Sequence, residues 1–162
     1  MSPIHRLSPR VFGPPLLAGA VLIAGGGVAA GMTGAEAAKA RIDHMKAMGA
    51  AMKAVGEQLK SGATDPAVIK VQVAKIDVGA KALDTWFPTG SGKDAYAKSQ
   101  ALPVVWTDPA GFETKAKALA AAAAKLDAAA QAGQAAAIGP AAHEVGAACK
   151  SCHEKYKAKD ES

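Results

Sequence analysis

The chain is short of cysteine and of aromatic residues. Its 162 residues include two cysteines, Cys149 and Cys152, and Phe, Trp and Tyr together make up only 4%. Two cysteines exclude a disulfide framework, and alone they cannot complete the four Cys or His ligands of a structural zinc site. The scarcity of aromatic residues argues against a large β-sheet core, and the abundant alanine, the strongest helix former, predicts an all-α fold.

Clusters of like charge are also missing. The formal net charge is +5, but the lysines are spread along the chain with acidic residues among them, as on solvated helix faces. This pattern gives no support for nucleic-acid binding. Apart from Arg6 and Arg10, the sequence has 17 basic residues, of which Arg41 is the only arginine, against 14 acidic ones.

Charged residues are absent from residue 11 to residue 35, directly after Arg6 and Arg10. A basic segment followed by a short apolar core is typical of a secretory signal peptide. Small residues at 28–30 and at 35–37 give two candidate cleavage sites. The uncharged run could also span a bilayer as an uncleaved anchor, although three consecutive glycines disfavour a stable spanning helix.

We therefore interpret residues 1–35 as a signal peptide or membrane anchor and residues 36–162 as one domain. The export signal predicts a periplasmic location for this domain. Contact with the membrane is expected only if the N-terminal segment remains uncleaved.

The two cysteines belong to the sequence Cys149-Lys150-Ser151-Cys152-His153, the C-x-x-C-H pattern of covalent haem attachment. On a helix, thiols three residues apart share a face, so each can add to a vinyl group of one porphyrin. His153 projects from the same face and can supply the fifth ligand of the iron. A thioredoxin-like pair, half of a zinc site and a chance pair are the alternatives, but neither a βαβ pattern nor a second ligand pair accompanies the motif.

Apolar residues recur every three or four positions in four segments, which predicts four amphipathic helices. The first runs from about 35 to 60, and the second from a cap at 64 or 65 to about 85. A loop at 86–92 and a connection at 93–107 lead to the third, from 108 to 133. The fourth carries the apolar face from 142 to 156, and Gly139-Pro140 either opens it or kinks its first turns. This order predicts an antiparallel four-helix bundle that can bury the haem between facing helices.

Several motifs together resemble the cytochrome c′ family, also called class II cytochromes c, over essentially all of residues 36–162. These motifs are Arg41 with Met45 four residues later, Phe87-Pro88-x-Gly90-Ser91, Ala101-Leu102-Pro103-x-x-Trp106 and Val145-Gly146-x-x-Cys149-x-x-Cys152-His153. The resemblance implies a four-helix bundle with one haem c attached near the end of the chain. It also implies that His153 is the proximal ligand and that the first helix covers the distal side.

The resemblance places Met45 opposite His153. Many family members have an apolar residue there that does not bind iron, which leaves the iron open to small gases. A thioether in this position gives His/Met ligation, which raises the reduction potential and favours electron transfer. The alternative is that Met45 is only a core residue. We expect Met48 and Met52, one and two turns further along, to pack around the haem edge or in the core.

Arg41 lies one turn before Met45 and is expected to face the haem propionates or the nearby solvent edge, where its guanidinium can pair with a carboxylate in a forked geometry. A surface arginine is the alternative. Tyr156 and Lys157 follow His153 by three and four residues, so either can flank the proximal ligand. We expect His44 to be exposed.

The sequence thus predicts an electron-transfer cytochrome with one haem c, and not an enzyme. The first alternative is a cytochrome that binds nitric oxide or carbon monoxide, and the second is a dithiol or metal-binding helical protein without haem. The expected partners are redox proteins that the sequence does not identify. The family resemblance also implies a homodimer through the first helices as one possible assembly.

Overall fold

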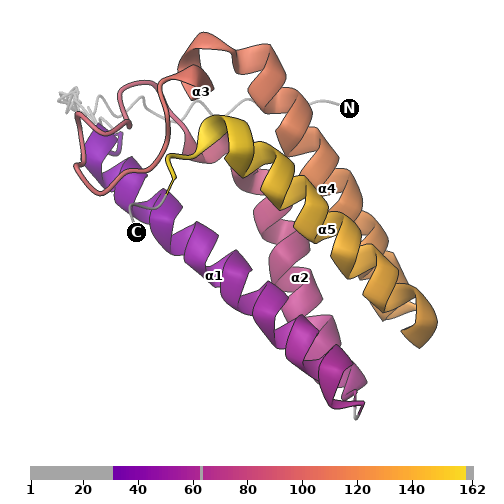
Figure 1. The fold of residues 1–162 in the computed structure, drawn as a ribbon. Helices are drawn as coiled ribbons and strands as arrows, with labels where there is room; N and C mark the ends of the chain where they lie inside the picture. Colours follow the sequence, from indigo (N-terminus) through magenta and orange to yellow (C-terminus); the bar gives the residue numbers. More distant parts are fainter. Residues whose placement is uncertain (1–30, 63, 160–162) are drawn as a thin grey trace, which may run out of the picture. The chain divides into compact units, whose positions relative to one another are not determined.

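The computed structural model describes residues 31–62 and 64–159. Four long helices account for most of this part of the chain: α1 Gly34–Ser61, α2 Pro66–Ala82, α4 Pro109–Gln131 and α5 Ala135–Tyr156. Successive helices run in opposite directions as an antiparallel bundle (Figure 1). The predicted fold class is therefore confirmed, and the described residues form no strand beyond one isolated bridge between Ala101 and Lys157.

Local signals in the sequence set the ends of the helices. A capping box begins α1: the amide of Glu36 donates to Oγ1 of Thr33 (3.2 Å), and the amide of Thr33 donates to Oε2 of Glu36 (2.8 Å). Gly62 ends the helix with a left-handed φ of 68°. The side chain of Asp65 caps α2, and Asp108 caps α4, each directly before a proline at the first helical position.

The structure settles one helix boundary that the sequence left open and shifts another. α5 begins at Ala135 and passes through Pro140, so Gly139-Pro140 lies within the first two turns of the helix, the second of the two alternatives, and does not open it. Proline removes one backbone hydrogen bond there, and the helix-forming alanines before it keep the turn helical. The second predicted helix ends as α-helix at Ala82 and tightens into the 3₁₀ turn η1, Leu83–Trp86.

The connection between α2 and α4 contains a short helix that the sequence did not reveal, α3 Val104–Thr107. Its side chains form a small second core together with α4 and the end of α5. This core is built from Val105, Phe112 and Tyr156. The connection is therefore packed against the bundle near the end of α5.

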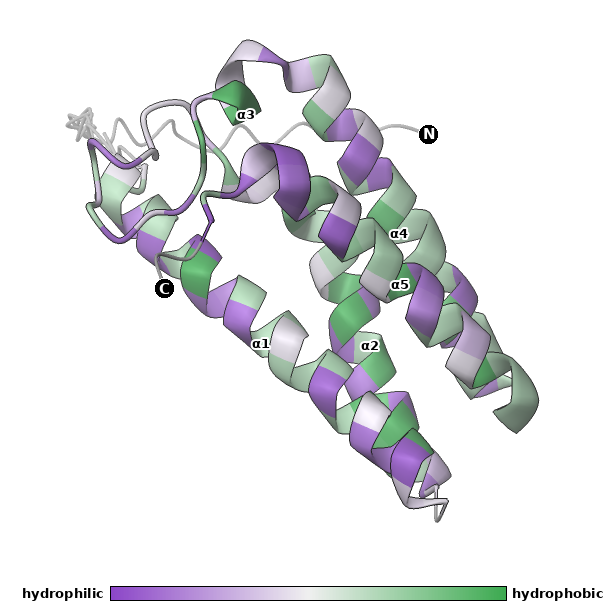
Figure 2. Ribbon diagram, viewed as in Figure 1, coloured by the Kyte–Doolittle hydropathy of each residue, from purple (hydrophilic) through white to green (hydrophobic). Residues whose placement is uncertain are grey.

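The main core lies along the stripes that the three-and-four spacing predicted. Figure 2 shows hydrophobic and hydrophilic residues alternating along each helix. The larger side chains with almost no exposure are Val55, Ile69, Val73, Ile76, Leu83, Leu126 and Val145. Small residues complete the contacts between helices: a Cβ added at Gly79 would lie 2.6 Å from Sδ of Met48. Glycine at this position lets Met48 fill the crossing of α1 and α2.

The predicted signal peptide or anchor lies mostly outside the described residues, as does its candidate cleavage site at 28–30. Among the helices of residues 31–62 and 64–159, none is both long and apolar enough to cross a membrane.

Candidate functional site

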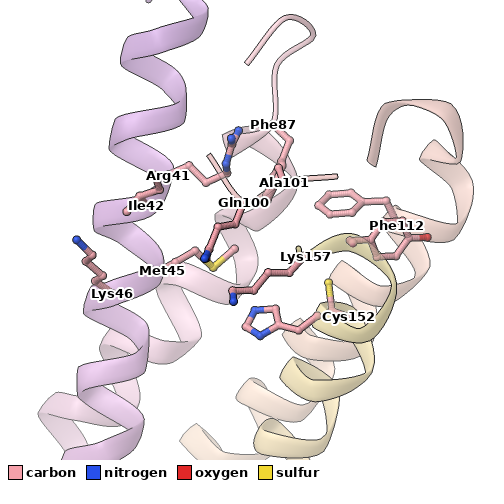
Figure 3. A pocket seen from close by; sticks show the side chains of 12 residues that line it. Arg41, Ile42, Met45, Lys46, Phe87, Gln100, Ala101, Phe112, Cys152 and Lys157 are labelled. Carbon is pink, nitrogen blue, oxygen red and sulfur yellow. The ribbon is translucent and has the colours of Figure 1, made fainter. Parts of the chain in front are cut away.

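A cavity of about 280 Å³ lies beside the first half of α1 and the last turns of α5. Four of the five predicted site residues line it. Its lining comprises Arg41, Ile42, Met45 and Lys46 of α1, Phe87, Gln100 and Ala101 of the connection, Phe112 of α4, and Cys152, His153, Tyr156 and Lys157 of α5 and its end. Figure 3 shows side chains from these separate elements converging on one space.

Met45 differs from its two neighbouring methionines in where its side chain lies. Met45 is partly buried, and Figure 3 shows its sulfur on the cavity side of α1. Met48 is 7% exposed and belongs to the main core, and Met52 packs against that core. The expected packing roles of Met48 and Met52 are confirmed. His44 is exposed, as expected, and stacks on the ring of Trp86 with a centroid distance of 4.6 Å.

The attachment motif occupies the last turns of α5. Cys152 and His153 line the cavity, and His153 is an exposed residue. Cys149, one turn earlier, is not among the lining residues and packs against the main core. Burial raises the pKa of both thiols, and the positive charge of Lys115 opposes this rise at Cys152.

Aromatic rings form one wall of the cavity. Phe112 meets Phe87 and Tyr156 edge to face, with centroid distances of 4.7 Å and 5.2 Å. The hydroxyl of Tyr156 donates to Oδ2 of Asp108 (2.8 Å), an oxygen that also accepts from Nζ of Lys155 (2.6 Å). These two hydrogen bonds, with the one from the amide of Gly111, lower the pKa of the Asp108 carboxyl. Tyr156 thus lines the cavity with its ring, while its hydroxyl is fixed to the cap of α4.

Arg41 is not at the solvent edge. It is 4% exposed, so both the expected solvent-edge position and the alternative of a surface arginine are wrong. Its Nη1 donates to Oγ of Ser91 (2.8 Å) and the carbonyl of Trp86 (3.2 Å), and its Nη2 donates to the carbonyl of Ser91 (2.7 Å) and Oγ of Ser99 (2.9 Å). Contact between Arg41 and a haem carboxylate remains a prediction.

The guanidinium of Arg41 also lies over the ring of Phe87, 4.6 Å from its centroid. Burial lowers the pKa of Arg41. The sequence signalled this environment only indirectly, through a single arginine among many lysines, because the serine partners lie 50 and 58 residues away.

Comparison with known proteins identifies the arrangement. The family model described as Cytochrome C′ matches residues 36–157. The chain belongs to the cytochrome c′ family. Cytochrome c′ of Pararhodospirillum photometricum is 37% identical over 122 residues, which cover 75% of this chain and 90% of that protein. Cytochrome c′ of Rubrivivax gelatinosus is 49% identical over 70 residues, which cover 43% of this chain and 54% of that protein.

In these sequence matches, the chain thus spans about half the length of the Rubrivivax gelatinosus relative and of two cytochromes c-554 from Cereibacter sphaeroides. The crystal structure of cytochrome c′ from Rubrivivax gelatinosus is 33% identical and superposes with a TM-score of 0.71, covering 78% of this chain and 98% of that one. A further solved cytochrome c′, described as having a ligand-controlled dimer dissociation, is 29% identical with a TM-score of 0.75, covering 80% of this chain and all of that one.

Proteins of the cytochrome c′ family carry one covalent haem c with its iron, and the residues of this cavity fit that group. Cys152 and Cys149 stand three residues apart on one helix, His153 follows them, and aromatic and apolar side chains line the space beside them. Thiols form thioethers with the porphyrin, the imidazole suits the iron, and the rings suit a flat apolar macrocycle. The haem supplies reversible one-electron chemistry when it is bound.

The attachment chemistry can be tested directly. If Cys149 and Cys152 form the two thioethers, haem stays with the polypeptide through denaturation and acid-acetone extraction. The double variant Cys149→Ala/Cys152→Ala should yield little holoprotein and a poorly folded chain, since bound haem stabilises the folded state. Haem staining after denaturing electrophoresis measures both results. Extractable haem in the wild type would contradict attachment through this motif.

Proposed function

We propose that this cytochrome c′ is a periplasmic electron carrier in which His153 and Met45 are the two axial ligands of the haem iron. The observation that carries the proposal is that His153 of α5 and Met45 of α1 line the same cavity from different helices. Met48 and Met52 continue the same stripe of α1 but do not line the cavity: Met48 is a member of the main core, and Met52, like Met45, packs against that core. Met45 is therefore the thioether best placed for the iron.

The surroundings of Met45 and His153 suit electron transfer. Thioether ligation opposite histidine raises the reduction potential. Phe87, Phe112 and the ring of Tyr156 supply apolar surface that limits the access of water. Substrate conversion is not part of this proposal, because the chain's residues hold and tune the haem and form no product of their own.

The second candidate function is the binding of a small gas at the iron. A variant of cytochrome c′ of Alcaligenes xylosoxidans has been solved in its ferrous form with bound nitric oxide, in a chain 30% identical to this one. This function requires that Met45 stays off the iron or leaves it easily. Methionine is unbranched and flexible, so displacement would need only a change of rotamer.

Met45→Leu separates the two functions. Leucine keeps the volume and the apolar character, so the free energy of unfolding should change by less than about 1.5 kcal/mol. We expect the ferric haem to change from low-spin to high-spin and the reduction potential to fall. If Met45 occupies the iron nine-tenths of the time, ferrous haem should bind carbon monoxide about tenfold more tightly in the variant.

Met48→Leu is the matched control, because Met48 lies on the same stripe but one turn, about 5.4 Å, further along. Its spectrum and carbon monoxide affinity should equal those of the wild type. A wild-type protein that is already high-spin at neutral pH, or an unaltered Met45→Leu spectrum, would refute the ligation and favour gas binding.

We also propose export with cleavage near residue 30. The second candidate site, Ala35-Glu36-Ala37, lies in the first turn of α1, so cleavage after Ala37 would remove Thr33 and Glu36, the two members of the capping box.

Residues 1–37 fused to a reporter should carry it across the cytoplasmic membrane. N-terminal sequencing of the native protein should give a first residue close to 31. An intact N-terminus in the membrane fraction would show an anchor instead.

A homodimer through α1 and α2 is the assembly that we propose. Val71 and Val78 of α2 are 54% and 67% exposed, and Val78 borders a groove of about 490 Å³ between the two helices. One solved relative is described as dissociating from a dimer under ligand control.

Val78→Glu should weaken dimerisation at least about tenfold in sedimentation, because a symmetric interface brings two such charges together. Ala118→Glu, at an exposed position of α4, is the control; a monomeric wild type would refute this assembly.

A further inference from the structure

The helices that carry the two proposed ligands are held mainly by other helices. α5 packs chiefly against α4. In turn, α4 also packs against α2, and α2 also packs against α1, whereas direct packing between α1 and α5 is slight. Figure 1 shows α1 and α5 as separate walls of the bundle. Helix packing therefore sets the distance between Met45 and His153 only indirectly, through α2 and α4.

On the side of α1, Arg41 holds the connecting segment. Its Nη2 donates to Oγ of Ser99 (2.9 Å) and to the carbonyl of Ser91 (2.7 Å). The two serines are 4% and 0% exposed, so water does not compete for these bonds. Ser99 is also the last residue before the stretch 100–102, and its Oγ accepts a longer hydrogen bond from the amide of Ala101 (3.4 Å).

On the side of α5, residues 100–102 pair with the chain that leaves the helix. The amide of Leu102 donates to the carbonyl of Tyr156 (3.0 Å), and the amide of Ala158 donates to the carbonyl of Gln100 (2.8 Å). Between them, Ala101 and Lys157 form the isolated antiparallel bridge. A continuous path of hydrogen bonds thus leads from Arg41 through Ser99 and residues 100–102 to residues 156–158. We call residues 99–102 the strap.

The strap reaches both helices about one turn from the ligands. Arg41 lies one turn before Met45, and residues 156–158 begin about one turn after His153. Gln100 and Ala101 of the strap also line the cavity itself. A shift of the strap would consequently move both walls of the cavity relative to each other.

We propose that Arg41 is a positioning residue that sets the distance between Met45 and His153 through the strap. This inference rests on the proposed ligation of the iron by these two residues. In this proposal Arg41 acts on that distance through its hydrogen bond to Ser99, separately from any contact that it makes with a haem carboxylate. Loss of the bond between Arg41 and Ser99 lets α1 move away from α5, which weakens the contact of Met45 with the iron.

The decisive variant is Ser99→Ala, because it keeps Arg41 and removes its acceptor in the strap, together with the longer hydrogen bond from the amide of Ala101. We expect part of the ferric haem to become high-spin and carbon monoxide to bind the ferrous form about tenfold more tightly, which corresponds to about 1.4 kcal/mol at the Met45 bond. Hydrogen exchange at the amides of Leu102 and Ala158 should become faster. Ser61→Ala, at the exposed end of α1, is the matched control and should change none of these quantities.

Arg41→Lys gives the second test, since lysine cannot reproduce the forked donation. If both residues act through one bond, the effect of Arg41→Lys with Ser99→Ala on carbon monoxide affinity should be clearly less than the product of the single effects. Equal affinity in Ser99→Ala and wild type, when the wild type is low-spin, would overturn the proposal. A Ser99→Ala variant that only lowers the denaturation midpoint would overturn it as well.

Failure of the ligation itself would be visible separately, as a wild-type protein that is high-spin before any substitution. The strap is then judged on hydrogen exchange alone. Faster exchange at Leu102 and Ala158 in Ser99→Ala would support its role in joining α1 to α5, and unchanged exchange would overturn it.

Discussion

A buried guanidinium must have its donors satisfied, and this requirement organises the half of the bundle that contains the cavity. Among the described residues, the hydrogen-bond partners of Arg41 are carbonyl and hydroxyl oxygens of Trp86, Ser91 and Ser99, which compensate its charge. Each unsatisfied N–H in such a place would cost about 1–3 kcal/mol. The connection between α2 and α4 is accordingly folded onto α1 and is not a loose loop.

This constraint explains why a long connection can form part of a precise site. Helices α1, α2, α4 and α5 make the bundle through close-packed small and aliphatic side chains, whose contacts are not directional. Hydrogen bonds, in contrast, are directional. Those at this end of the bundle are the bonds of Arg41, the backbone pairing at 100–102, and the bond from the indole of Trp106 to the carbonyl of Phe87 (3.0 Å). The apolar core supplies the stability of the fold. These polar contacts select one arrangement of the helices and the connection around the cavity.

Much of this architecture could be predicted from the sequence, because its signals are local. Three-and-four spacing, the caps at Asp65 and Asp108 and the glycine at residue 62 each act within a few residues. The same holds for the C-x-x-C-H motif, whose members share a helix face by spacing alone. Met45 was distinguished from Met48 and Met52 in another way, by the family resemblance that places it four residues after Arg41.

The remaining features depend on partners far apart in the chain. Nothing near Arg41 indicates that Ser91 and Ser99 will reach it, and nothing near Asp108 indicates that Lys155 and Tyr156 will share its carboxylate. Helix α3 was missed because four residues show no period. Long-range hydrogen bonds by polar side chains leave no pattern in a single sequence.

The cavity wall has one more property, which concerns its electric field. The residues that line it include Arg41, Lys46 and Lys157 but neither Asp nor Glu. Low polarizability in a partly buried site lets such charges act at longer range than in water. A metal centre in this space gains positive charge when it is oxidised, so the surrounding cations disfavour the oxidised form. The wall would therefore favour the reduced form of such a centre more than the axial ligands alone would.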